Sequence, residues 1–253
     1  MKIRTAWIAK LLLPGAALAA PDEIRLPPPE EARQDPGFHW VGRTRPLPET
    51  IAGEWSWTPD GRRVWRARLR ASGARALRLR FESFSMPGEV LLYGEGRDET
   101  AAGPYGGGGP HRDGGFWSGL VPGEAVTVEY LPAESVPAVD ALPFQLQALA
   151  RIDSPQLPLP STPRKPSGPP PRAIAGCHLD ASCFPEVEDR ANPGVVLVYV
   201  TLGQGSYSCT GFLINPTFES DRTLLLMTAG HCIDTAEKAR DAAFLWRYQT
   251  EEC

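Results

Sequence analysis

The chain has 253 residues, 42% of them hydrophobic, and its 26 lysines and arginines against 30 aspartates and glutamates give a net charge of −4. This length suits one or two globular domains, and a weakly acidic chain with a pI near 5.7 argues against a nucleic-acid partner. The 25 glycines and 27 prolines form no repeat and favour strands joined by turns, so the expected fold class is all-β.

Residues 1–20 have the pattern of a secretory signal peptide. Two basic residues near the start precede an apolar run from Leu11 to Ala20, which ends in a small-x-small cleavage pattern. The run is too short to span a bilayer, so we expect cleavage after Ala19 or Ala20, no membrane anchor, and a secreted protein, extracellular or periplasmic. Residues 21–37 form a proline-rich N-terminal segment.

Residues 38–153 show the two-residue alternation of half-buried strands. Apolar residues alternate with charged ones, mostly arginine, from Trp65 to Arg70 and from Leu77 to Glu82. These two strands and further ones predict a β-sandwich. Basic strands can also bind nucleic acid, but the alternation explains the arginines as the solvent-facing half of each strand. The further strands are expected at 90–93, 116–120, 126–131 and 144–152.

Two segments rich in glycine or proline interrupt the expected strands. The run Gly106–Gly109 lacks the Gly-Lys-Ser/Thr ending of a phosphate loop, and we expect a flexible loop there. Residues 154–172 form a proline-rich linker that should be extended and exposed. Basic sites in exposed linkers are readily cleaved, and prolines flank Arg164 and Lys165, so the bond between Arg172 and Ala173 is the expected maturation site.

Residues 173–253 contain all five cysteines and a second group of expected strands. Pairing the second and third of these strands as a hairpin places Cys209 almost opposite His231 and Cys232, close enough for a disulfide. A bridge between Cys209 and Cys232 would close a 24-residue loop and add about 3 kcal/mol on the chain-entropy model. The strands are expected at 195–202, 206–214, 224–228 and 242–248.

The third of these strands ends in Met227-Thr228-Ala229-Gly230-His231-Cys232, which resembles the histidine signature of chymotrypsin-like serine peptidases. In that family the imidazole is the general base for a serine hydroxyl, so the resemblance implies that His231 is a catalytic residue. A lone histidine at a strand end is more often a core residue bonded to carbonyls. Here the small residues before it allow a sharp turn that brings the ring to a cleft.

The cysteine spacing, with the segments Cys177–Cys183, Cys209–Asn215 and Trp246–Cys253, resembles bacterial lysyl endopeptidases. The resemblance implies protein or peptide substrates, cleavage after lysine or another basic residue, and a zymogen. It also implies three disulfides, which pair Cys183 with Cys253, Cys209 with Cys232, and Cys177 with a cysteine outside the 253 residues.

Zinc ligation is the competing explanation of these cysteines and histidines. No Cys-x-x-Cys pair or His-x-x-x-His step supplies two ligands from one turn, and an oxidising compartment favours disulfides, so we expect no metal and no cofactor. Asp234 and Asp241 are the only aspartates after His231 in the sequence. Because the triad template takes its aspartate from a distant loop, we expect both to be solvated surface groups.

The N-terminal half carries a second resemblance, to the jelly-roll-type region that precedes the catalytic domain in several secreted bacterial peptidases. It rests on core aromatics and turns, such as Gly53-Glu54-Trp55, Trp65 and Phe116-Trp117-Ser118, so it implies a fold and no activity. The predicted architecture is a jelly-roll-like β-sandwich, a proline-rich linker, and an incomplete chymotrypsin-like β-barrel at 173–253. The sheet edges of that barrel are expected to be unpaired.

The position of His231 in the chain limits the expected function. The triad template places the aspartate roughly 45 residues after the histidine and the serine roughly 90 residues further on. Only 22 residues follow His231, and Gly-Asp-Ser-Gly-Gly occurs nowhere in the sequence. We therefore interpret the chain as the N-terminal part of a secreted serine endopeptidase, inactive by itself. The alternative is a non-catalytic secreted binding protein with a truncated protease-like domain.

Overall fold

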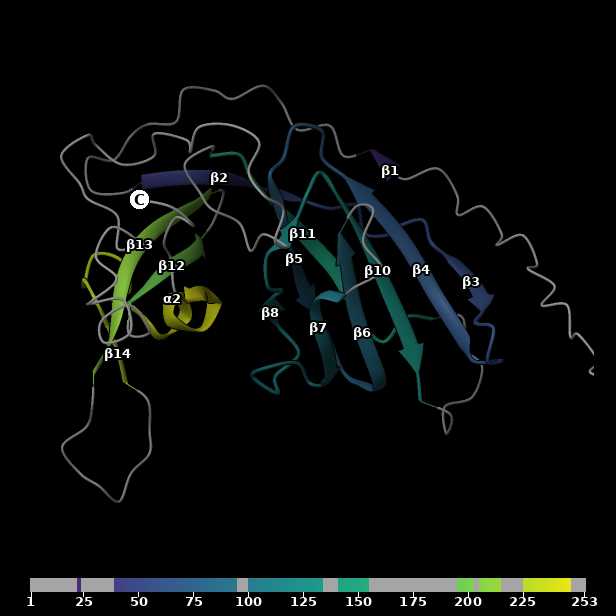
Figure 1. The fold of residues 1–253 in the computed structure, drawn as a ribbon. Coiled ribbons are helices and arrows are strands. Elements are labelled where there is room, and N and C mark those ends of the chain that lie inside the picture. Colours follow the sequence, from purple (N-terminus) through teal and green to yellow (C-terminus); the bar gives the residue numbers. More distant parts are fainter. Residues whose placement is uncertain are drawn as a thin grey trace, which may run out of the picture.

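The computed structural model describes residues 22–23, 39–94, 100–133, 141–154, 195–202, 205–214 and 225–246. Within these residues the strands form two sheets and the helix content is a single short helix, so the fold is all-β, as predicted (Figure 1). The predicted signal peptide and all but the first residue of the predicted linker lie outside this range. We call residues 39–154 of the described range the N-terminal unit, and residues 195–246 the C-terminal unit.

The first sheet has six strands in the order β1-β4-β10-β6-β7, with β3 paired to β4. All of its pairings are antiparallel except the one between β1 and β4. Strands β4 and β10 are central and alternate between buried and half-buried residues, as expected of strands with one face on the core. The strands are β1 (Asp22–Glu23), β3 (Glu54–Trp57), β4 (Arg63–Arg70), β6 (Met86–Gly94), β7 (Thr100–Gly107) and β10 (Ala125–Pro132).

The second sheet has nine strands and includes residues of both units. Its order is β15-β12-β13-β2-β11-β5-β8, with β14 paired to β13 and β9 paired to β5. From the N-terminal unit come β2 (His39–Pro46), β5 (Ala76–Glu82), β8 (Phe116–Trp117), β9 (Val121–Pro122) and β11 (Gln145–Ile152). From the C-terminal unit come β12 (Val195–Leu202), β13 (Gly205–Ile214), β14 (Leu225–Thr228) and β15 (Ala242–Trp246).

The main core lies between the two sheets of the N-terminal unit and is rich in aromatic rings. Phe81 of β5 stacks on Phe116 of β8 with ring centroids 5.0 Å apart, and meets Phe84 edge to face at 5.5 Å. Trp65 of β4 meets Phe144 edge to face at 6.1 Å. Offset and edge-to-face contacts of this kind add to the burial of the rings themselves. The core therefore holds the two sheets together as a sandwich.

Strand β2 connects the two units within one sheet. Its first half pairs with β13 and its second half with β11, so residues Gly42 and Arg43 have a partner on both sides. The prediction that the sheet edges of the C-terminal region are unpaired is therefore wrong for β13. Periodicity did not reveal β2, because its sequence, His-Trp-Val-Gly-Arg-Thr-Arg-Pro, contains a glycine and no regular apolar alternation.

Two expectations about the N-terminal unit need correction. Arg78 of β5 does not face solvent as the alternation predicts: its side chain is buried, with 2% relative exposure. The glycine run is not a flexible loop, because Gly106 and Gly107 end strand β7 and the following turn closes with backbone bonds such as Gly109 N to Gly106 O at 3.0 Å. Gly107 and Gly109 have positive φ angles of 59° and 79°, which explains the glycines.

The C-terminal unit also contains a helix that the sequence did not indicate, α2 (Ala236–Asp241). Thr235 caps it, since its side chain accepts a hydrogen bond from Lys238 N at 3.2 Å. Six residues are too few for apolar periodicity to show. Among the described residues, no helix has the length and apolar character that crossing a membrane requires.

Candidate active site

The candidate catalytic histidine lies in a turn between β14 and α2. Cys232 N and Ile233 N both donate to Ala229 O, at 2.9 and 3.3 Å, and this closes the turn around Gly230 and His231. Strand β14 leads into the turn in antiparallel register with β13, so that Thr228 lies opposite Gly211. His231 itself is exposed. The turn therefore presents the imidazole to solvent, where a substrate could reach it.

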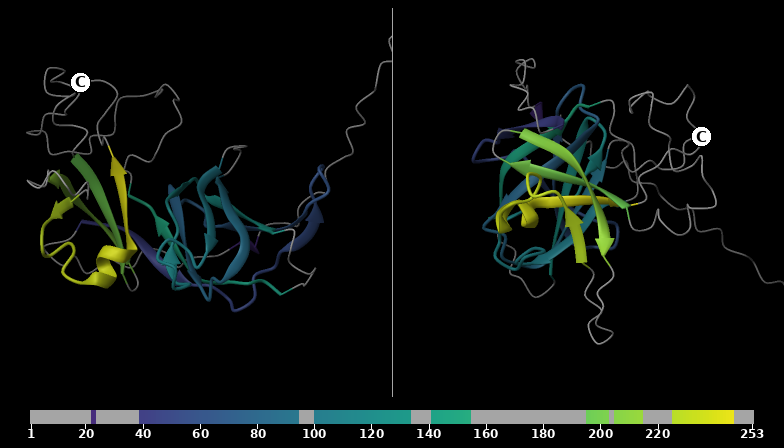
Figure 2. Two further views of the ribbon diagram at one scale, coloured as in Figure 1. Left: turned by 90° about the horizontal axis from the view of Figure 1, so that it is seen from below. Right: turned by 90° about the vertical axis from the view of Figure 1, so that its left-hand side faces the viewer.

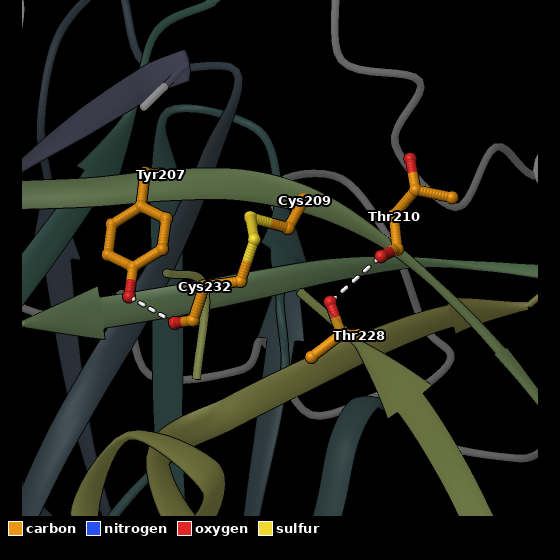
Figure 3. The surroundings of a disulfide bond; sticks show 5 residues. All are labelled: Tyr207, Cys209, Thr210, Thr228 and Cys232. Atoms are coloured by element: carbon orange, nitrogen blue, oxygen red, sulfur yellow. Dashed lines mark hydrogen bonds between the residues drawn. A yellow bond between two sulfur atoms is a disulfide. The ribbon is translucent and has the colours of Figure 1, made fainter. Parts of the chain in front are cut away.

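A disulfide between Cys209 of β13 and Cys232 closes the hairpin beside this turn, with a Cα–Cα distance of 6.3 Å (Figure 3). The hairpin argument from the sequence predicts this bond. The Thr228 hydroxyl adds a second cross-strand link by donating to Thr210 O at 2.8 Å. Both ends of the segment from Thr228 to Cys232 are thus fixed to β13.

Tyr207, also on β13, supports the turn from within the protein. Its hydroxyl donates to the backbone carbonyl of Cys232 at 2.6 Å, and Figure 3 shows the two groups pointing toward one another. Burial raises the pKa of Tyr207, which keeps the hydroxyl protonated as a donor. Trp40 of β2 packs edge to face on the Tyr207 ring at 5.7 Å. A strand of the N-terminal unit therefore contacts the residue that holds Cys232.

The two aspartates that follow His231 in the sequence have basic partners. Asp234 is exposed and forms an ion pair with Lys238 at 2.6 Å, and this hydrogen bond lowers the pKa of Asp234 and raises that of Lys238. Asp241 was expected on the solvated surface and this is wrong: it is 7% exposed, and Arg80 donates to both of its carboxylate oxygens. Asp234 therefore binds a residue of α2 from the position before the helix, and Asp241 binds Arg80 from the last position of the helix.

The ligand-type atoms of Cys209, His231 and Cys232 lie within 4.8 Å of one another. A divalent metal would need the two sulfurs as thiolates. In this structure they are bonded to each other, so the cluster offers one imidazole nitrogen and no thiolate ligand. The arrangement suits proton transfer by an imidazole whose backbone is held in place on both sides.

Several predicted site residues lie outside the described range. These are the maturation bond between Arg172 and Ala173, and the cysteines Cys177, Cys183 and Cys253. Conversely, the structure places two residues at the site that the sequence did not indicate, Tyr207 and Trp40. Tyr207 lies two residues before Cys209 and therefore on the same face of β13. This spacing is the one feature of the sequence that could have identified Tyr207 as a site residue.

Comparison with known proteins agrees with the sequence resemblance. Residues 173–253 match the family model described as "Lysyl endopeptidase, C-terminal domain". Over 229 residues the chain is 31% identical to a lysyl endopeptidase of Pseudomonas aeruginosa, an alignment that covers 79% of this chain and 44% of the relative. The chain thus spans less than half the length of that relative. No solved structure matches. The resemblance to bacterial lysyl endopeptidases is confirmed.

Proposed function

We propose that this lysyl endopeptidase-like chain supplies the general base, His231, of a secreted serine endopeptidase. The observation that carries the proposal is the exposed imidazole in a turn fixed by a disulfide to the neighbouring strand, within the segment that matches the peptidase family. A general base must keep its position while it gains and loses a proton. This turn is fixed by the hydrogen bond of the Thr228 hydroxyl and by the hydrogen bond from Tyr207 to the Cys232 carbonyl.

In the proposed mechanism His231 accepts the proton of a serine hydroxyl as the serine oxygen attacks the peptide carbonyl. It then donates that proton to the leaving amine. The orienting aspartate lies outside residues 1–253 in this proposal, because Asp234 pairs with Lys238 and Asp241 with Arg80. The serine is also proposed to lie outside them, because the motif Gly-Asp-Ser-Gly-Gly does not occur in the sequence. Residues 1–253 alone should therefore not hydrolyse peptides by a triad mechanism.

The proposed substrates are proteins or peptides, cleaved after lysine or a related basic residue. This specificity rests on the similarity to the lysyl endopeptidase of Pseudomonas aeruginosa and to the lysyl endopeptidase family. Secretion is proposed from the signal-peptide pattern of residues 1–20, and it agrees with the disulfide, since disulfides persist in oxidising compartments.

Maturation is proposed to occur in the proline-rich segment, at the bond between Arg172 and Ala173. The remaining cysteines are proposed to pair as Cys183 with Cys253, and Cys177 with a cysteine outside the 253 residues. N-terminal sequencing of the secreted protein tests the maturation site. Mass spectrometry of non-reduced peptides, made with a protease that cleaves before aspartate and so separates Cys177 from Cys183 at Asp180, tests the pairing. A mature N-terminus other than Ala173, or a peptide linking Cys177 to Cys183, would contradict them.

The test of the base is a comparison of two variants in the complete gene product. His231→Ala should lower kcat/KM for a lysyl peptide substrate by roughly 10⁴-fold or more, and should abolish labelling by a fluorophosphonate serine reagent. Asp234→Asn is the matched control in the same turn, because Asp234 pairs with Lys238, and it should retain activity. Full activity of His231→Ala would refute the proposal.

A further inference from the structure

The groups at the His231 turn can combine in a second way once the disulfide is reduced. The ligand-type atoms of Cys209, His231 and Cys232 lie within 4.8 Å of one another. Donor atoms that bind one zinc ion, at about 2.0–2.3 Å each, lie within about 4 Å of one another. The disulfide therefore uses two of three donor atoms whose spacing is already close to that of a metal site.

Contacts that do not involve sulfur hold both cysteines in place. The Tyr207 hydroxyl donates to Cys232 O at 2.6 Å, and Cys232 N donates to Ala229 O at 2.9 Å. Cys209 lies within β13, which is paired with β12 at this position. The two Cα atoms are 6.3 Å apart. These backbone positions do not depend on the sulfur–sulfur bond, so both thiols should stay near the imidazole after reduction.

The three donors select the class of metal. Two thiolates and an imidazole are ligands of Zn²⁺ and similar ions, whereas Ca²⁺ and Mg²⁺ take oxygen ligands. Cys232 is buried and Cys209 is half-buried. Two thiolates cancel the charge of a divalent cation, so the bound ion would add no net charge to this partly buried position. His231 is exposed, which leaves the fourth tetrahedral position to water.

A metal ion can reach these groups from solvent. The left view of Figure 2 shows the yellow loop between β14 and α2 at the end of the C-terminal unit that lies away from the N-terminal unit. Both Gly230 and His231 in this loop are exposed. Among the described residues, no atom lies within 4 Å of a Cβ added to Gly230. The turn is therefore open on the side from which an ion would enter.

We propose that reduction of the disulfide between Cys209 and Cys232 creates a Zn²⁺ site of two thiolates and the His231 imidazole. A dithiol reductant supplies two electrons and two protons, which convert the sulfur–sulfur bond into two thiols, and the reductant becomes a cyclic disulfide. Zn²⁺ then replaces the two thiol protons, which pass to the buffer, and it also binds an imidazole nitrogen. The ion restores the link between β13 and the turn that the disulfide provided.

This metal site goes beyond the proposed peptidase activity, and its formation does not depend on that activity. Its effect on catalysis does rest on the proposed function. A neutral imidazole has one nitrogen lone pair, so Zn²⁺ bound at either ring nitrogen leaves none to accept a serine proton. The disulfide would thus keep the candidate base free of metal, and reduction in the presence of Zn²⁺ would block it.

The test uses the 253-residue chain with Cys177→Ser, Cys183→Ser and Cys253→Ser, so that Cys209 and Cys232 are the only thiols after reduction. The chain is reduced with dithiothreitol without oxygen, desalted and titrated with Co²⁺, whose thiolate complexes show a sulfur-to-cobalt charge-transfer band. One equivalent should bind and be displaced by Zn²⁺, and the oxidised chain should show no band. A reduced chain without the band, or an equal band in the oxidised chain, would overturn the proposal.

Single variants of this chain test the histidine ligand. His231→Ala should raise the Zn²⁺ dissociation constant at least about tenfold, since even groups that only hydrogen-bond to zinc ligands contribute about that much. His111→Ala is the matched control, because His111 is also exposed but contacts Arg240 O at 3.0 Å, outside the cluster. Equal affinities of the two variants would refute the assignment of His231.

A second measurement covers a loss of fold in the triple serine variant. The reduced parent chain should bind one equivalent of Co²⁺ more than reduced Cys209→Ser, and equal binding would contradict the proposal. Because Co²⁺ binding is read from absorbance without a peptide substrate, a failure of the proposed peptidase function would leave this result unchanged.

Discussion

The hydroxyl of Tyr207 donates to the backbone carbonyl of Cys232 at 2.6 Å. This bond joins β13 to the residue that follows His231, and it lies beside the disulfide between Cys209 and Cys232. The candidate base is therefore held by a buried hydrogen bond and by a covalent bond, both from the same strand. Four predictions follow from this arrangement and from the contacts between the two units.

Removing the Tyr207 hydroxyl should destabilise the turn. Tyr207→Phe keeps the ring against Trp40 but leaves the Cys232 carbonyl without this donor, so we expect a loss of about 1–3 kcal/mol in the free energy of unfolding. Urea denaturation followed by tryptophan fluorescence measures it. Tyr93→Phe is the control, because the Tyr93 hydroxyl makes a long 3.4 Å contact with Glu129 and should cost less. Equal losses would argue against the assigned role of Tyr207.

A methyl group at Gly205 should disrupt the contact between β2 and β13. Gly205→Ala would place a Cβ 2.3 Å from the Trp40 ring, and we expect this overpacking to cost about 1–3 kcal/mol. Gly230→Ala is a matched control, since no atom lies within 4 Å of the new Cβ, and it should change stability by less than about 0.5 kcal/mol. A destabilisation by Gly230→Ala as large as that by Gly205→Ala would contradict this reasoning.

Loss of the disulfide should loosen the hairpin that carries His231. The double variant Cys209→Ala with Cys232→Ala should lower the free energy of unfolding by about 3 kcal/mol, because the open chain gains entropy in the unfolded state. Hydrogen exchange should also accelerate at the amides of Cys232 and Ile233, which bond to Ala229 O. Unchanged stability and exchange would show that the hydrogen bonds alone hold the turn.

Acid should weaken the contact between the two units at Asp113, whose carboxylate pairs with Arg240 of α2. The hydrogen bond from Arg240 holds the pKa of this carboxyl below its ordinary value of 3.8. A lowered folded-state pKa means that the contribution is present above pH 3.8 and disappears as the pH falls further, through the folded-state pKa. The free energy of unfolding should therefore decline below about pH 4, and Asp113→Asn should show a smaller decline.

Asp60 provides the control for this pH effect. Its pKa is also lowered, first by a hydrogen bond from Thr58 and then by one from Arg62, but it lies in a hairpin within the N-terminal unit. Asp60→Asn should leave the acid dependence of hydrogen exchange in α2 as in the parent, whereas Asp113→Asn should reduce it. If Asp113→Asn behaves like Asp60→Asn, the pair between Asp113 and Arg240 does not help to hold α2 against the N-terminal unit.

Much of the fold and part of the site could be predicted from the sequence, because they depend on local patterns. The alternation in β4 and β5 marks strands since it matches the two-residue period of a sheet. The hairpin of β13 and β14 follows from two apolar runs separated by turn residues, and it brings Cys209 beside Cys232. The histidine signature is likewise continuous in the chain. Each of these features lies within about 25 residues of sequence.

The contacts between distant segments were decided only by the tertiary structure. Arg78 and Arg80 have the same local pattern, yet one is buried among three acceptors and the other reaches Asp241 at the end of α2. The pairing of β2 with β13 joins residues more than 150 positions apart. Local periodicity determines which residues can face a core, whereas the choice of partner depends on packing between elements that the sequence does not place side by side.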